Sequence, residues 1–120
     1  MSSPLRFEPF RDAEYEFQGF VGNRLKANLD HWLLVAPQSN LGMLEMFRDR
    51  DQEPRRDLLP WAGEFAGKYL VSGVLCWRIG RDAALRAQLE GFVEELISVQ
   101  VDDGYLGPFP RHERLVGKTV

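Results

Sequence analysis

A nearly uninterrupted apolar segment in the second half of the chain constrains the fold more than any other feature. Residues 61–79 read WAGEFAGKYLVSGVLCWRI, and apolar residues fall on almost every side of a helical projection. A helix with so few polar flanks has to be covered by neighbouring elements on several sides. The sequence therefore predicts that this helix lies in an interior.

A second long helix is expected directly after this segment. Gly80 and Arg81 indicate a tight turn, and Asp82 is a candidate N-cap for a helix over residues 83–99. The apolar residues of that helix form one stripe: Leu85, Leu89, Phe92, Val93, Leu96 and Ile97. Charged residues occupy its other face, so we expect a half-exposed helix that pairs with the buried one as an antiparallel hairpin.

The first half of the chain predicts shorter elements. Residues 1–18 carry aromatic residues among charges and prolines without a sustained period, and we expect an extended arm that docks through its aromatics. A first helix is expected over residues 20–36, ended by Pro37. Asn40 is a candidate cap for a short helix over residues 41–47, and the following RDRDQEPRRD reads as solvated loop. No strand pattern of comparable strength appears, so the predicted fold class is all-α.

Charge and cysteine content exclude several function classes. The 120 residues carry a net charge of −3 with both signs interspersed, so no basic face for nucleic acid stands out. The single cysteine, Cys76, excludes an internal disulfide framework and a zinc cluster built from thiolates of this chain alone. The start of the chain lacks the apolar core of a signal peptide, and the uncharged apolar stretch of residues 69–77 is far too short for a membrane span. We expect a cytoplasmic protein without nucleic-acid or membrane partners.

An antiparallel hairpin would bring the start of its first helix and the end of its second to the same end. Trp61 and Glu64 would then neighbour the segment QVDDGYLGPFPR, whose turn signals present Tyr105 on a loop. Aromatic rings stack on sugar faces, and acidic oxygens accept hydroxyl protons, so this end is a candidate sugar-binding surface. Packing of the loop over the core is the alternative interpretation of the same residues.

Other candidate residues have more ordinary explanations. Glu64 lies four residues before Lys68, the favourable order for a helical ion pair, but an acid on a buried helix would also suit a hydroxyl acceptor. His31, beside Trp32, could reach a ligand from the end of the first helix, although a structural histidine is the simpler interpretation. Cys76 reads as a small buried thiol. No motif of a metal site or of a known nucleophile, phosphate or dinucleotide site is present.

Four stretches resemble a known family when they are taken together. They are NRLKANLDHWLL, GMLEMFRDRD, LLPWAGEFAGKYLVSGV and SVQVDDGYLGPFPR. They are similar to the N-terminal part of the β-L-arabinofuranosidase-like glycoside hydrolases of family 127, a former domain of unknown function. The resemblance runs from about Phe17 to Arg111. It implies that residues 19–120 are the N-terminal segment of an (α/α)6 six-hairpin toroid, preceded by the arm of residues 1–18.

The resemblance also implies an activity and a cofactor that this chain cannot supply by itself. Relatives are retaining glycosidases with a zinc-bound cysteine nucleophile and a glutamate acid/base, which belong to the later half of the toroid. Nothing here matches that cysteine-rich segment, so no catalytic residue and no cofactor are expected in this chain. The expected partner is a carbohydrate, contacted by Trp61, Glu64, Tyr105 and His31.

The helices present are too few for a closed toroid, which would leave apolar faces of the inner helix uncovered. We therefore expect a truncated member, an engineered segment or a piece of a split gene that is inactive alone. The alternative is a non-enzymatic helical interaction module that oligomerises or binds a partner through its apolar face. A less favoured interpretation is an α/α-toroid epimerase or lyase.

Overall fold

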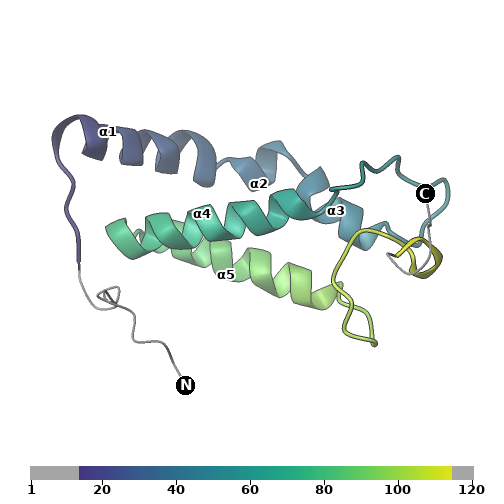
Figure 1. Ribbon diagram of the computed structural model, residues 1–120. Helices are drawn as coiled ribbons and strands as arrows, with labels where there is room; N and C mark the ends of the chain where they lie inside the picture. Colours follow the sequence, from purple (N-terminus) through teal and green to yellow (C-terminus); the bar gives the residue numbers. More distant parts are fainter. Residues whose placement is uncertain (1–13, 115–120) are drawn as a thin grey trace, which may run out of the picture.

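The computed structural model describes residues 14–114, and within that range every regular element is helical (Figure 1). The longer helices are α1 (Gly19–Asn28), α3 (Gly42–Arg48), α4 (Glu64–Gly80) and α5 (Ala83–Ser98), with the short elements η1 (Leu29–Leu33), α2 (Ala36–Ser39) and η2 (Arg111–Glu113). The all-α prediction is confirmed for this part of the chain. None of these helices combines the length and apolar character needed to cross a membrane.

The first predicted helix is broken into three elements, and Pro37 does not end it. After α1, the backbone widens into the π-helical turn η1, in which the Leu34 N–H donates to the Leu29 carbonyl at 3.0 Å. Pro37 then lies in the first turn of α2, where a missing N–H costs little. Because Pro37 has no N–H, the Leu33 carbonyl four residues earlier has no helical partner. The Tyr69 hydroxyl donates to this carbonyl at 3.0 Å, and Gln88 Nε2 donates to it at 2.6 Å.

The short third helix forms nearly where the sequence predicts it. It begins at Gly42 instead of residue 41, and the predicted side-chain cap from Asn40 is absent. The main-chain carbonyl of Asn40 instead accepts from the Met43 N–H at 3.1 Å. A carbonyl thus satisfies one of the free N–H groups at this helix start, and the side chain is not required.

The helices α4 and α5 lie side by side and run in opposite directions (Figure 1). Helix α4 begins three residues later than predicted, because residues 61–63 form a turn. The turn between the helices is closed by Arg81 in the left-handed region, with φ of 51°. The N-cap prediction for Asp82 is confirmed, since its Oδ1 accepts from the Leu85 N–H at 2.8 Å.

The core is formed where α4 and α5 approach each other and meet η1, α2 and α3. At Gly73 a Cβ atom would lie 2.5 Å from Leu89 Cδ2, so this glycine permits the close approach of the two helices. The rings of Tyr69 and Phe92 pack with their centroids 4.9 Å apart. The buried cluster consists of Leu33, Ala36, Met43, Phe47, Ala66, Tyr69, Leu85, Leu89, Phe92 and Leu96.

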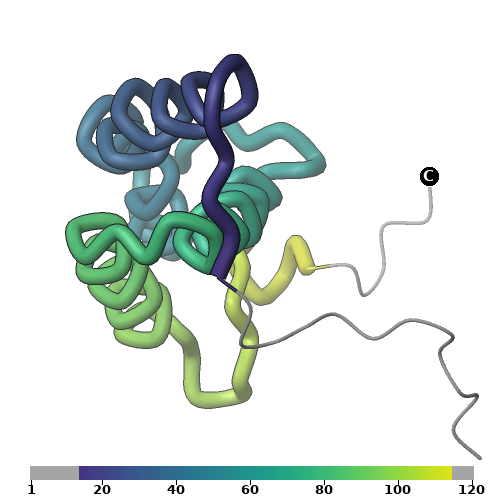
Figure 2. The backbone as a smooth tube through the Cα atoms, turned by 90° about the vertical axis from the view of Figure 1, so that its left-hand side faces the viewer, coloured from purple at the N-terminus to yellow at the C-terminus, as the bar shows by residue number. Residues whose placement is uncertain are grey.

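The prediction that the apolar helix lies in an interior is wrong for the described part of the chain. Helix α4 contacts η1 and α5 (Figure 2). These neighbours cover one side of α4, and its other side exposes Val71 (62%), Val74 (44%) and Leu75 (54%). On α5, Leu85, Leu89, Phe92 and Leu96 of the predicted stripe are buried, whereas Val93 and Ile97 are exposed. The described helices therefore leave part of the apolar surface of α4 and α5 uncovered.

Only the end of the predicted N-terminal arm lies within the described residues. Residues 14–18 have no regular structure, and the rings of Tyr15 and Phe17 stack with centroids 6.3 Å apart. Both aromatics line a cavity of about 390 Å³ against Leu25 of α1 and Cys76 of α4. The expectation for residues 1–13 lies outside the described range.

Candidate functional site

Two loops meet at the end of the helix pair where α4 begins and α5 ends (Figure 1). One connects α3 to α4, and the other follows α5. They touch at Gly63, where a Cβ atom would lie 3.1 Å from Pro108 Cδ and 3.3 Å from Phe47 Cζ. Gly63 also has a φ of 94°, which favours glycine. The geometry thus gathers Trp61, Glu64 and the Tyr105 loop at one end of the helices.

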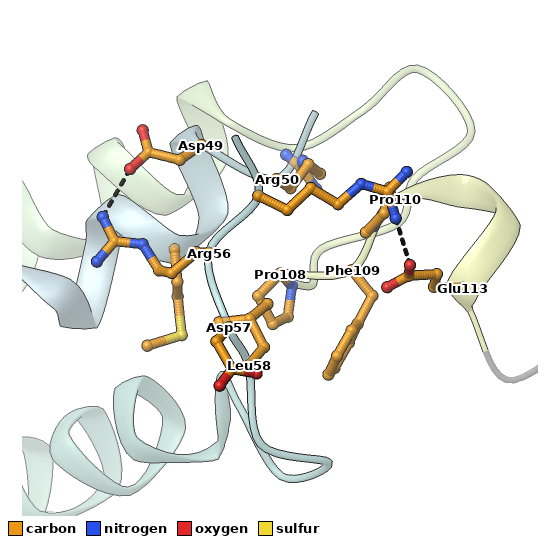
Figure 3. Close-up of a pocket in the computed structure, with 11 residues that line it drawn as sticks. Asp49, Arg50, Arg56, Asp57, Leu58, Pro108, Phe109, Pro110 and Glu113 are labelled. Carbon is orange, nitrogen blue, oxygen red and sulfur yellow. Dashed lines mark hydrogen bonds and ion pairs between the residues drawn. The ribbon is translucent and has the colours of Figure 1, made fainter. Parts of the chain in front are cut away.

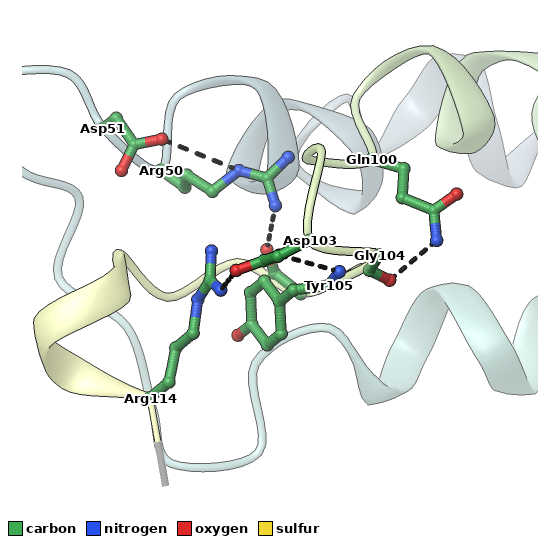
Figure 4. Close-up of polar contacts among 8 residues, drawn as sticks. Arg50, Asp51, Gln100, Asp103, Gly104, Tyr105 and Arg114 are labelled. Atoms are coloured by element: carbon green, nitrogen blue, oxygen red, sulfur yellow. Dashed lines mark hydrogen bonds and ion pairs between the residues drawn. The ribbon is translucent and has the colours of Figure 1, made fainter. Parts of the chain in front are cut away.

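The segment from Gln100 to Tyr105 forms a turn that is held by its own side chains (Figure 4). Gln100 Nε2 donates to the Gly104 carbonyl at 2.7 Å, and Gly104 adopts a φ of 84°. Asp103 accepts from the Tyr105 N–H at 3.1 Å and from Arg114 Nη1 at 2.7 Å. These bonds, first that from the Tyr105 N–H and then that from Arg114, lower the pKa of Asp103. Gln100, Asp103 and Gly104 therefore have structural roles in this turn.

Tyr105 is half-buried, and one face of its ring is occupied. The Arg114 guanidinium carbon lies 3.8 Å from the ring centroid, a cation–π contact. Arg114 Nε is buried there without a hydrogen-bond partner. On the other side of the loop, a Cβ atom on Gly107 would lie 2.3 Å from the Tyr105 hydroxyl oxygen. A ligand could therefore contact only the part of the Tyr105 ring that neither Arg114 nor Gly107 covers.

Arg50 corrects the prediction that the charged loop after α3 is solvated throughout. Its side chain is 4% exposed, and Nη1 donates to the Gly107 carbonyl at 2.9 Å (Figure 4). Its Nε lies 3.9 Å from an oxygen of Asp51. The guanidinium thereby joins the loop after α3 to the loop after α5, and a buried carbonyl obtains a charged donor.

A cavity of about 380 Å³ lies between these two loops (Figure 3). Three arginines and three carboxylates line it: Arg50, Arg55, Arg56, Asp49, Asp57 and Glu113. Phe109 supplies an aromatic wall, and Pro108 and Pro110 supply apolar ones. The formal charges of the ionic lining residues cancel. The cavity therefore presents a neutral polar surface with one ring.

The ion pairs of this cavity fix its guanidinium groups in place. Arg56 Nη2 lies 2.7 Å from Asp49 Oδ2 and 3.2 Å from Glu45 Oε2, and Arg55 pairs with Glu113. The hydrogen bond to Asp49 is the largest influence that raises the pKa of Arg56. The remaining N–H groups of these planar side chains and the free lone pairs of the carboxylates can bind hydroxyl groups.

The structure places Trp61 and Glu64 at the surface of the same end. Trp61 is 63% exposed. Glu64 is exposed too and pairs with Lys68, with Nζ and Oε1 3.0 Å apart. The expectation of an acid on a buried helix is therefore wrong, because residue 64 lies on the uncovered side of α4. Its part in ligand binding stays a prediction, and the same holds for Trp61.

His31 lies on η1 with an exposed side chain. The next residue, Trp32, packs edge-on against Phe65 in the first turn of α4, with ring centroids 5.7 Å apart. The π-helical turn thus brings His31 to the same end of α4 as Glu64. None of the four predicted contact residues lines the cavity of Figure 3.

Cys76 lies away from this site, in the last turns of α4. It is partly buried, and burial, followed by the charge of Asp82, raises the pKa of its thiol. Within residues 14–114, no three His, Cys, Asp or Glu residues are grouped as a metal site would require.

Sequence reasoning missed Arg50, Arg55, Arg56 and Phe109, which line the cavity. The alternation of arginines and acids in RDRDQEPRRD is the signal that could have found them, since such a loop can pair its own charges.

Known proteins add no further evidence for a site. A scan against protein-family models finds no match for this chain, and searches of curated proteins and of solved structures find no significant match. A function is therefore proposed from the geometry of the chain itself.

Proposed function

We propose that this chain is the N-terminal part of a β-L-arabinofuranosidase-like glycoside hydrolase with an α/α-toroid fold. In this proposal α4 is an inner helix, α5 is an outer helix, and further helices cover the exposed side of α4. The chain contributes scaffold and carbohydrate contacts and no catalytic residue. Zinc and the cysteine nucleophile belong to the later half of such an enzyme.

The observation that carries this proposal is the charge-neutral polar cavity between the two loops. A neutral polyhydroxylated ligand has no charge to pair, so it suits a lining whose ionic groups already balance one another. The Arg56–Asp49 pair and Phe109 together offer planar donors, acceptors and a ring. The cavity of about 380 Å³ also lies within the ordinary range of small-ligand sites.

The predicted contact residues would extend this site over the neighbouring surface. Trp61 offers an exposed ring for stacking, and Glu64 offers carboxylate oxygens to hydroxyl groups. Tyr105 is held by Arg114 beside the cavity loop, and His31 approaches from η1. The exposure of Trp61, Glu64 and His31 suits binding of a sugar between this chain and another part of the enzyme.

The test is an NMR titration of this chain with methyl β-L-arabinofuranoside, followed through amide and indole resonances. We expect shifts confined to the loops of residues 49–63 and 99–114 and to the two further contacts, Glu64 and His31. Arg56→Met should abolish these shifts, because it removes a guanidinium that lines the cavity. Tyr15→Ala, which removes an exposed aromatic of the other cavity, should leave them unchanged. The absence of any shift up to the solubility limit of the glycoside would contradict a sugar site in this chain.

A second function is favoured by a different observation. The exposed Val71, Val74 and Leu75 of α4 form an apolar surface that the described helices do not cover. We propose as the alternative a non-enzymatic helical module that oligomerises or binds a partner through this surface. Sedimentation velocity over a concentration series tests it, since a chain that stays monomeric throughout would contradict self-association.

A further inference from the structure

One side of α4 carries exposed residues at a regular spacing. We call Glu64, Lys68, Val71, Leu75 and Arg78 the α4 outer face, and all five are exposed. Successive members are four and three residues apart in alternation, which is the spacing of a coiled-coil seam. Helices with this spacing pack nearly parallel or antiparallel, at crossing angles near 20°.

The charges at the two ends of the α4 outer face are opposite in sign, and Lys68 between them pairs with Glu64 of its own chain. The face begins with the acid Glu64 in the first turn of α4, has Val71 at its centre, and ends with the cation Arg78 in the last turns. Val71 lies seven residues from each of these charges. A two-fold axis through Val71 would therefore place Glu64 of each copy opposite Arg78 of the other. Antiparallel pairing would also align the two helix dipoles favourably.

The shapes on either side of Val71 match in the same register. Gly67 lies four residues before Val71, and a Cβ atom there would meet nothing within 4 Å. Leu75 lies four residues after Val71 and is 54% exposed. The two-fold axis that pairs the charges thus places each leucine over the glycine of the other copy. One register satisfies both charge and shape.

We propose that two copies of this chain pair through the α4 outer face. The two α4 helices run antiparallel, with Val71 on the two-fold axis and a Glu64–Arg78 ion pair at each end. This inference rests on the second function proposed above and specifies its partner as a second copy.

Charge-reversal substitutions test the pairing, with the dimer dissociation constant measured by sedimentation velocity. Glu64→Arg places two arginines at each end of the dimer, and Arg78→Glu places two glutamates there. We expect each substitution to raise the dimer dissociation constant at least about tenfold. An equimolar mixture of the two variants should recover the dimer, because the heterodimer has opposite charges at both ends.

Two matched variants control for effects of charge alone. Glu94→Arg on α5 and Arg24→Glu on α1 make the same changes at exposed positions away from the α4 outer face. Both should dimerise as the wild type does, and circular dichroism should show that all variants keep their helices. A wild-type chain that stays monomeric would overturn this inference and, with it, self-association as the function of the module. A dimer that is insensitive to the single substitutions would overturn only the register proposed here.

Disulfide cross-linking tests the register directly in a Cys76→Ser background. Val71→Cys should cross-link rapidly, because residues on the two-fold axis lie within the distance that a disulfide spans. Leu75→Cys is the control, since the two copies of residue 75 would be about 12 Å apart along the helix axes. Faster cross-linking at residue 75 than at residue 71 would overturn the proposed register.

Discussion

The hydroxyl of Tyr69 donates a hydrogen bond to the main-chain carbonyl of Leu33, 3.0 Å away. Gln88 Nε2 donates at 2.6 Å both to this carbonyl and to the Tyr69 oxygen. Burial raises the pKa of Tyr69, and the bond from Gln88 opposes this shift. The carbonyl needs these donors because Pro37 cannot supply the usual helical N–H. Three elements distant in sequence thus meet at one buried polar point.

Tyr69→Phe should lower the free energy of unfolding by about 1–2 kcal/mol, because a buried hydrogen bond is lost while the ring is retained. Urea denaturation followed by circular dichroism gives this difference. Tyr15→Phe makes the same chemical change at an exposed residue and should have almost no effect. Equal stability of both variants would mean that the hydroxyl of Tyr69 does not contribute.

Gly73→Ala should destabilise the chain by about 1–3 kcal/mol, because the new Cβ atom would overlap the buried Leu89 side chain. Gly91→Ala in α5 is the matched control, since a Cβ atom there meets nothing within 4 Å. That substitution should be neutral or stabilise by up to about 1 kcal/mol through helix propensity. Thermal melts of the two variants should therefore shift differently. A Gly73→Ala variant as stable as Gly91→Ala would contradict close packing at residue 73.

Asp103 should titrate below the usual range of an aspartate, because the Tyr105 N–H and Arg114 stabilise its charged form. A carboxyl whose pKa is lower in the folded state contributes stability above its unfolded pKa, near 3.9, and loses it as the pH falls through the folded value. Carbon-detected NMR of the carboxyl group measures the folded pKa.

Asp103→Asn tests the same linkage through stability. The difference in unfolding free energy from the wild type should be constant near neutral pH and should shrink below about pH 4. Asp102→Asn removes an equal charge from the neighbouring exposed residue and controls for the change in net charge. A difference that is independent of pH would show that Asp103 acts through geometry alone.

Arg50→Met should loosen the loop after α5, because the buried Gly107 carbonyl loses its donor, a change worth about 1–3 kcal/mol. Hydrogen exchange should increase at the Gly104 amide, which donates within the same loop to the Val101 carbonyl at 2.8 Å. Arg48→Met is the control, because its partner Glu95 and its own side chain both lie at the surface. Unchanged exchange in Arg50→Met would contradict the role of Arg50 in joining the loops.

The long helices could be predicted from the sequence because their signals are local. Helical spacing of apolar residues and the Asp82 cap define α4 and α5 to within a few residues. The break at η1 could not be predicted, since residues 20–36 keep a helical pattern and the donors to the Leu33 carbonyl at its end, Tyr69 and Gln88, are distant in sequence. Such tertiary bonds carry no local signature.

The candidate site was predicted only at the level of its position. The antiparallel course of α4 and α5 places Trp61, Glu64 and Tyr105 at one end, as the helix order implies. The burial of Arg50 depends on the Gly107 carbonyl, 57 residues later in the chain. An arginine in a charged loop gives no indication of such a partner, because composition alone suggests solvent exposure.

The carbonyl of Leu33 also determines how small a stable version of this domain can be. The pair α4 and α5 looks self-contained in sequence, but Tyr69 and Gln88 aim their polar groups at a partner more than 30 residues upstream of either one. A minimal domain that began after Leu33 would leave both groups without that acceptor. The smallest autonomous folding unit of this chain therefore includes the π-helical turn.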